Sequence, residues 1–204
     1  MKKFITTIPL QGRGELSSSV YQAVGNPALQ YDKKIAFPII AVMNAYVKEG
    51  EEIEVLAIKQ NHERTNRNYE IFQEQLKEFE KDKNCTCKIS LVSIPYEELV
   101  DTHLYTFEQL IEKLGHGDEL YACMTYGTKM VPIVEMLALN YACRVLDNTS
   151  LGCAAYGQLD HGTGTMKIFD ISSLLLMDEI VNRISSLKPA NPIGYIKTVL
   201  DIES

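Results

Sequence analysis

Short apolar runs alternate along this chain with stretches of helical periodicity. The apolar, β-branched runs predict internal strands, each of which ends in polar or turn residues; they span residues 4–9, 53–58, 87–94 and 120–124. Apolar residues spaced three and four apart predict helices at 35–47, 64–83, 106–114 and 130–145. Because strands that alternate with helices are typical of βαβ units, we expect an α/β fold, a Rossmann-like three-layer sandwich around a mostly parallel sheet.

The pattern changes towards the end of the sequence. Two strand-like segments, 151–156 and 166–171, are joined by a loop that contains glycines, and they predict a C-terminal β-hairpin. A helical stripe over 174–184 follows, and two prolines then break it. We therefore expect a ligand-binding domain over 1–187 and a linker or C-terminal arm over 188–204, which is too short for a second core.

Composition and charge narrow the classes of partner. The 204 residues are 46% hydrophobic and 23% charged, which is typical of one globular domain. Twenty basic and 27 acidic side chains give a net charge of −7, which argues against general binding of duplex DNA or of an anionic membrane surface. No window approaches the ~18 apolar residues of a membrane span, and the first apolar run is broken by threonines, unlike a signal peptide. We expect a soluble, cytoplasmic protein.

The residues that commonly bind metals or act as nucleophiles form no recognisable motif. The five cysteines lack paired C-x-x-C spacing, and we expect reduced, mostly buried thiols; they are Cys85, Cys87, Cys123, Cys143 and Cys153. The four histidines are scattered, and no serine stands in a G-x-S-x-G elbow. We therefore expect no metal, no cofactor and no hydrolase triad.

The strongest candidate site follows the strand at 120–124. In an open parallel sheet the ligand crevice lies beyond the carboxyl ends of the strands, and here the segment Thr125-Tyr126-Gly127-Thr128-Lys129 leads into an apolar helix. Gly127 permits a tight turn, Thr128 can cap the helix, and Lys129 adds a positive charge beside free N–H groups that attract phosphate. An ordinary capped turn explains the same residues equally well, because the full P-loop pattern is absent.

The loop after the first strand contains a second set of candidates. Pro9 ends the strand, and Gln11, Gly12 and Arg13 begin a loop that offers the first two glycines of a dinucleotide fingerprint. The third glycine is replaced by Ser17, and no helix opens at this turn, which argues against a nicotinamide or flavin site. Arg13 is either a phosphate or base contact or an ordinary surface arginine.

The second strand ends in a polar cluster that starts at Lys59. Asn61 or Thr65 can cap the following helix, and we favour that interpretation of the cluster over ligand contact. The candidate ligand-binding residues are Pro9, Gln11, Gly12, Arg13, Lys59, Thr125, Tyr126, Gly127, Thr128 and Lys129.

The segment 125–129, with Ala154-Ala155-Tyr156-Gly157 after the helix and Ile168-Phe169-Asp170-Ile171 before the last helix, resembles the CRISPR-associated Rossmann fold (CARF) family. The resemblance also takes in Gly12, Tyr21 and Phe37, and it covers most of residues 1–186. Its most specific part is the Gly-Thr-Lys turn.

The resemblance implies a homodimer whose paired crevices bind a cyclic oligoadenylate, the second messenger of type III CRISPR systems. A ring with two-fold symmetry suits a two-fold dimer, in which each protomer holds half of the ring. Helix N-termini and Lys129 would meet the phosphates, and Arg13, Gln11 and Tyr126 would contact sugars or adenines.

Members of this family commonly join the sensor to an effector, often a ribonuclease with an R-x-x-x-x-H motif, which this sequence lacks. We favour a sensor of cyclic tetra- or hexa-adenylate, either as part of an effector whose second domain is absent here or as a stand-alone regulator. The alternatives are a metal-independent ring nuclease and an unrelated nucleotide-binding enzyme. In the nuclease, Lys129 and Arg13 would stabilise the phosphorane, and Thr128 or Tyr126 would position the ring. The sequence shows no certain general base.

Overall fold

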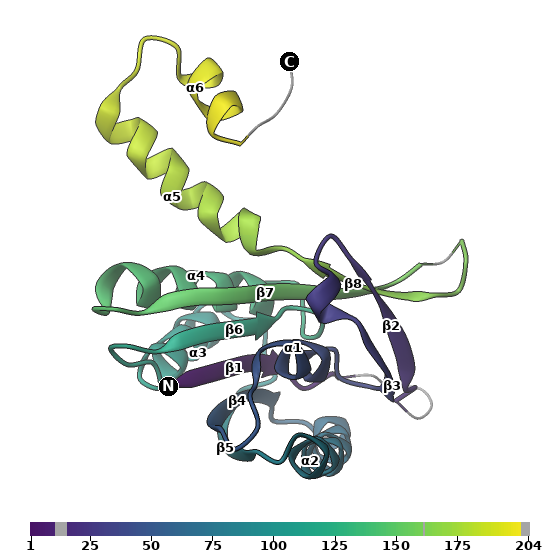
Figure 1. The fold of residues 1–204 in the computed structure, drawn as a ribbon. Coiled ribbons are helices and arrows are strands. Elements are labelled where there is room, and N and C mark those ends of the chain that lie inside the picture. Colours follow the sequence, from purple (N-terminus) through teal and green to yellow (C-terminus); the bar gives the residue numbers. More distant parts are fainter. Residues whose placement is uncertain (11–15, 161, 201–204) are drawn as a thin grey trace. The chain divides into compact units, whose positions relative to one another are not determined.

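The computed structural model describes residues 1–10, 16–160 and 162–200, and its strands form a single sheet with the order β3-β2-β8-β7-β6-β1-β4-β5 (Figure 1). The strands are β1 (Lys2–Thr7), β2 (Ser19–Val24), β3 (Tyr31–Ile35), β4 (Glu52–Gln60), β5 (Thr86–Ile94), β6 (Glu119–Cys123), β7 (Ser150–Leu159) and β8 (Met166–Asp170). The helices are α1 (Ile39–Tyr46), α2 (Glu63–Lys83), α3 (Val100–Ile111), α4 (Met130–Val145), α5 (Ser172–Leu187) and α6 (Pro192–Val199), with a 3₁₀ turn, η1 (Pro27–Leu29).

Strands β7, β6, β1, β4 and β5 run parallel, as neighbours in that order. The chain moves outward from β1 through α1 to β4 and through α2 to β5, and then returns through α3 and α4 on the other side of β1. Because such crossovers are right-handed, α1 and α2 cover one face of the sheet and α3 and α4 the other. The structure confirms the expected Rossmann-like α/β fold, and its topological switch point lies between β1 and β6.

The core on the α1 and α2 face is closely packed with aromatic rings. Phe4 of β1 stacks on Tyr121 of β6 with ring centroids 4.7 Å apart, and Phe37 meets Phe72 of α2 edge-on at 4.9 Å. These rings are almost fully buried. Burial of each contributes roughly 1.5 to 3 kcal/mol, and the rings hold the strands rigidly beneath the loops at the sheet's carboxyl edge.

The structure differs from the sequence-based expectation between β1 and α1. Residues 19–24 and 31–35 form β2 and β3, which pair antiparallel with each other, and β2 also pairs parallel with β8. The helix predicted from residue 35 begins only at Ile39, because Ile35 ends β3 and Pro38 occupies the N-cap. Strand β3 forms the edge of the sheet beside β2, and most side chains of both strands are exposed or half-buried, so they lack the continuous apolar pattern of the central strands.

Strands β7 and β8 pair antiparallel, with Leu159 opposite Met166. Helix α3 begins at Val100, six residues earlier than expected. The five cysteines form no disulfide within the described residues; Cys123 and Cys153 are buried, Cys85 and Cys87 are half-buried, and Cys143 is exposed.

The chain divides into two compact units, with the second starting at Ile171, whereas the sequence predicts a boundary after residue 187. This second unit contains α5 and α6. The segment expected to be a linker forms α6, because Pro192 occupies its first turn and the Asn191 side chain accepts a hydrogen bond from the Gly194 N–H at 2.9 Å. Within this unit, α5 and α6 border a cavity of about 320 Å³; its lining residues are Leu176, Glu179, Ile180, Arg183, Tyr195 and Val199.

Candidate functional site

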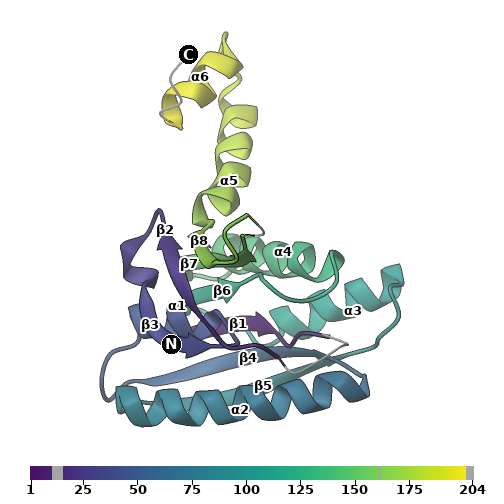
Figure 2. The ribbon, with the colours of Figure 1, turned by 90° about the vertical axis from the view of Figure 1, so that its right-hand side faces the viewer.

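The end of β1 and the turn between β6 and α4 meet at the switch point (Figure 2). Gly127 has a φ of +106°, and a Cβ at this position would lie 3.2 Å from Thr7 Cγ2 and 3.1 Å from Val131 Cβ. A side chain at residue 127 would therefore be both strained and crowded, since only glycine adopts such a φ readily. The expectation of a tight turn at Gly127 is confirmed, and the turn packs directly on Thr7.

Helix α4 begins at Met130, and Lys129 occupies its N-cap without a side-chain capping hydrogen bond. The expectation that Thr128 caps the helix is wrong, because its Oγ1 is buried and has no hydrogen-bond partner among the described residues. The first N–H groups of a helix have no partner within the helix, and the macrodipole makes this end positive. With the exposed Lys129 beside it, this end of α4 has the chemistry that anions favour.

Thr125 and Tyr126, two of the predicted ligand contacts, are engaged by the protein itself. Thr125 Oγ1 accepts a hydrogen bond from the Gly157 N–H at 2.8 Å, and the Tyr126 hydroxyl donates to Ala36 O at 2.6 Å. Burial raises the pKa of Tyr126 above its ordinary value. These two side chains therefore hold the β6–α4 turn against β7 and the start of α1.

Pro9 and Lys59 lie at the neighbouring strand ends. Pro9 is buried, and its carbonyl accepts a hydrogen bond from Asn68 Nδ2 of α2 at 2.7 Å. Lys59 is half-buried near the end of β4, and the side chain of its neighbour Gln60 is buried. The predicted contacts Gln11, Gly12 and Arg13 lie outside the described residues.

Helix α2 is capped by His62, whose Nδ1 accepts a hydrogen bond from the Arg64 N–H at 3.1 Å. Asn61 and Thr65, the capping residues expected from the sequence, form side-chain hydrogen bonds elsewhere. Ser93 Oγ donates to Asn61 Oδ1 at 2.6 Å, and Thr65 Oγ1 donates to Gln60 O at 2.6 Å. The polar cluster after β4 is therefore mostly occupied with local structure.

Sequence reasoning missed Glu135, which lies in the second turn of α4 and is 1% exposed. Its Oε1 accepts a hydrogen bond from Thr7 Oγ1 at 2.5 Å. Burial raises the pKa of Glu135 to about 8, and the Thr7 hydrogen bond opposes that rise. The signal was present in the sequence, because Glu135 is the sole charged residue between Lys129 and Arg144 in an otherwise apolar helix.

Three buried side-chain atoms lack a hydrogen-bond partner in the described part of the chain, and all three lie at or near the carboxyl edge. They are Gln60 Oε1, Thr128 Oγ1 and Glu135 Oε2. Such atoms are rare in folded proteins because an unpaired buried polar group costs about 1 to 3 kcal/mol. Among the described residues, hydrogen bonding at this edge of the sheet is therefore incomplete.

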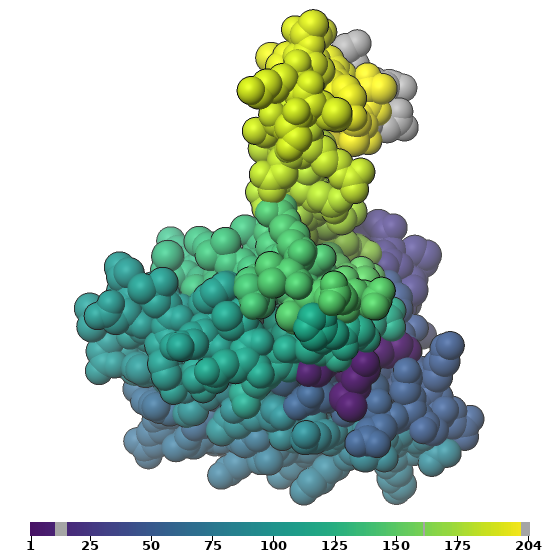
Figure 3. All heavy atoms as spheres, turned by 90° about the vertical axis from the view of Figure 1, so that its left-hand side faces the viewer, coloured from purple at the N-terminus to yellow at the C-terminus, as the bar shows by residue number. Residues whose placement is uncertain are grey.

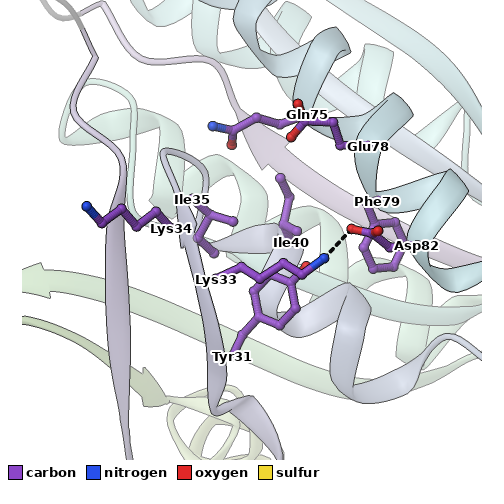
Figure 4. A pocket seen from close by; sticks show the side chains of 9 residues that line it. All are labelled: Tyr31, Lys33, Lys34, Ile35, Ile40, Gln75, Glu78, Phe79 and Asp82. Carbon is purple, nitrogen blue, oxygen red and sulfur yellow. Dashed lines mark hydrogen bonds and ion pairs between the residues drawn. The ribbon is translucent and has the colours of Figure 1, made fainter.

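A separate hollow between β3 and α2 is closed by an ion pair of 2.5 Å between Lys33 Nζ and Asp82 Oδ2 (Figure 4). Tyr31 and Phe79 line it, and its volume is about 40 Å³. That volume holds a water molecule but no nucleotide. The hollow shares no residue with the predicted site.

Within the described ranges, no three histidine, cysteine or acidic side chains gather as metal ligands, and no helix has the length and apolarity needed to cross a membrane. Comparison of the sequence with protein-family models and with curated proteins finds no match.

Proposed function

We propose that the carboxyl edge at the β1–β6 switch point binds a cyclic oligoadenylate, cyclic tetra- or hexa-adenylate, and that the protein is the sensor of this messenger. The observation that carries the proposal is the start of α4. There, a helix N-terminus without a side-chain cap, the exposed Lys129 and a glycine turn packed on Thr7 occur together at the topological switch point. This is where α/β folds bind ligands, and the local charge suits phosphate.

The connection after β1 favours an oligonucleotide over a dinucleotide cofactor. In the dinucleotide motif a helix opens directly after the first strand and its N-terminus holds the pyrophosphate. Here the next element among the described residues after β1 is the strand β2, and the helix N-terminus at the switch point belongs instead to α4. The phosphate contact is thus provided by the turn after β6.

An exposed apolar stripe on α4 supports the proposal that the sensor is a homodimer. Met130, Ile133 and Leu137 lie three and four residues apart, and they are 40%, 44% and 51% exposed. The stripe begins at the same turn that carries Lys129. A second copy packed on it would bring two such turns together about a two-fold axis, as a two-fold cyclic ligand requires.

The test mixes the purified protein with radiolabelled cyclic tetra- and hexa-adenylate in the absence of added metal. Retention of an intact ring on a filter supports a sensor. Conversion of the ring to linear product instead supports the ring nuclease, in which Lys129 and Arg13 would stabilise the phosphorane. Failure to retain or convert either ring contradicts the proposal and leaves an unrelated nucleotide-binding enzyme. The matched control is K77A, which removes an exposed lysine from α2, away from the switch point.

A further inference from the structure

Glu135 is the buried acid of the candidate site, and its contacts connect it to the anion-binding turn. Thr7 branches at Cβ, so a single χ1 angle sets the directions of its hydroxyl and its methyl. The hydroxyl donates to Glu135 Oε1 at 2.5 Å, and the methyl lies where a Cβ on Gly127 would be 3.2 Å away. The hydrogen bond from Thr7 to Glu135 therefore fixes the surface on which the Gly127 turn rests.

The surroundings of Glu135 suit a neutral carboxyl group. A carboxylate has two oxygens that need donors, yet Oε2 is buried and has no partner in the described ranges, so Thr7 is the donor recorded for this group. Leaving a charge buried with one hydrogen bond is costly. The helix end above it, in contrast, attracts anions.

Among the described residues, no charged side chain contributes to the shift in the pKa of Glu135. Burial and the Thr7 hydrogen bond determine the shift of its pKa, and the buried Cys123 thiol of β6 has a pKa near 12 and stays neutral. Helices and strands packed around α4 carry other titratable side chains, namely Asp101, His103, Tyr105 and Glu108 on α3 and Cys153 and Tyr156 on β7. Of these, His103 is directed at Glu98, with 3.6 Å between His103 Nε2 and Glu98 Oε2.

We propose that Glu135 is a positioning residue of the site: its neutral carboxyl holds Thr7 and the Gly127 turn in the anion-binding arrangement, and its ionisation weakens anion binding there. Ionisation places a negative charge beneath the first turn of α4, which opposes the attraction of phosphate to Lys129 and the helix end. Glutamine preserves the shape and cannot ionise. The proposal rests on the proposed function for its ligand.

The first experiment measures the dissociation constant of cyclic tetra-adenylate by calorimetry between about pH 6.5 and pH 9 for the wild type, E135Q and T106V. We expect the wild-type constant to rise roughly tenfold over this range and the E135Q constant to change much less. T106V removes a buried hydroxyl on α3 that bonds Thr102 O of its own helix, and it should follow the wild type. Identical pH profiles for the wild type and E135Q would overturn the proposal.

The second experiment needs no ligand and separates the two proposals. Hydrogen exchange at the amides of residues 126–131 is compared between the wild type and E135Q at each pH, which cancels the intrinsic pH dependence of exchange. We expect the wild-type amides to lose protection relative to E135Q as the pH rises past about 8. If no ring binds at any pH, the ligand assignment fails, and the exchange comparison still decides the positioning role. Equal protection of the two proteins would exclude that role.

Discussion

The two ends of the parallel strands carry polar groups of opposite character. We call the side of the sheet where β1, β4 and β6 begin the amino edge, and the side where they end the carboxyl edge. At the amino edge, Lys3 Nζ lies 2.9 Å from Asp118 Oδ2 and 3.5 Å from Glu54 Oε2, and it donates a hydrogen bond to Lys113 O. Beside it, Lys2 Nζ lies 2.9 Å from Glu51 Oε2. Figure 3 shows this edge, where the start of β1, in purple, lies among the blue and teal segments.

At the carboxyl edge the same sheet leaves polar atoms unpaired. Buried oxygens of Gln60, Thr128 and Glu135 have no partner within the described ranges, and α4 begins without a side-chain cap. Unpaired buried groups are destabilising, so a chain under selection for stability alone would pair them. The comparison indicates that the chain itself pairs the charges of the amino edge, whereas the carboxyl edge keeps unpaired buried atoms within the described residues, the arrangement that the proposed ligand site requires.

The largest expected effect concerns the stability contributed by Glu135. Its pKa rises from 4.5 in the unfolded chain to about 8 in the folded protein, so between these values the folded state keeps a proton that the unfolded state has lost. The contribution of Glu135 to the free energy of unfolding should therefore fall as the pH rises from about 4.5 to about 8, by a total on the order of 5 kcal/mol. Urea unfolding at several pH values measures this fall.

E135Q cannot lose that proton, so its free energy of unfolding should decline much less over the same range. Subtracting the unfolding free energy of E135Q from that of the wild type at each pH removes the contributions of all other titrating groups. Parallel curves would show that Glu135 does not titrate as its burial requires.

The second-largest expected effect follows from removing the charge of Lys3 at the amino edge. K3M removes the cation shared by Asp118 and Glu54, whose side chains are only 7% and 12% exposed, and it leaves two carboxylates close together. We expect a loss of about 2 to 3 kcal/mol in unfolding free energy, less than for a fully unpaired buried charge, because Asp118 keeps the N-terminal ammonium at 3.3 Å and Glu54 keeps Lys88 Nζ at 3.9 Å. Ligand affinity should not change, since Lys3 lies at the opposite edge from the site.

K33M is the matched control for K3M. It breaks the pair with Asp82, in which both side chains are about half exposed, and such pairs contribute little. A similar loss in K33M and K3M would contradict the special role of the amino edge. If K3M is fully folded and loses ring binding whereas K33M does not, the prediction that the amino edge has no part in ligand binding would be contradicted.

The parallel half of the fold could be predicted from the sequence because its central strands β1, β4 and β6 are mostly buried. Continuous apolar runs such as residues 55–58 have few other interpretations, and α4 was predicted with its observed bounds. Strands β2 and β3 were missed because exposed edge strands have mixed polar sequences. The start of α6 was missed because Pro192 was interpreted as a helix breaker, although proline also favours the first turn of a helix.

The candidate site could be predicted only in part, for a different reason. The Gly127 turn and Lys129 are local in sequence, and the order of strands and helices was sufficient to place them at the carboxyl edge. The contact between Thr7 and Glu135 joins residues far apart in the chain, and no local pattern specifies it. Tyr126 and Thr125 could not be classified as structural without knowing that Ala36 and Gly157 lie beside them.

A third prediction tests the carboxyl edge through its exposed cation. K129A removes a positive charge from the exposed N-cap position of α4. We expect binding of cyclic tetra-adenylate to weaken by roughly 1 to 3 kcal/mol, the contribution of a charge-assisted hydrogen bond to phosphate. Stability should be nearly unchanged. K77A should bind as the wild type does, and unaltered affinity in K129A would remove this lysine from the site.

The smallest expected effect separates structural residues from ligand contacts within the carboxyl edge. Y126F deletes the hydroxyl that donates to Ala36 O at 2.6 Å, and it keeps the ring that packs edge-on against Phe37. We expect a loss of about 1 kcal/mol in unfolding free energy, because the buried carbonyl loses its donor, with little change in ring affinity. Y105F, which removes an exposed hydroxyl from α3, should alter neither quantity. If Y126F instead keeps full stability and loses affinity, the Tyr126 hydroxyl turns to the ligand on binding, and the turn after β6 is less rigid than its hydrogen bonds indicate.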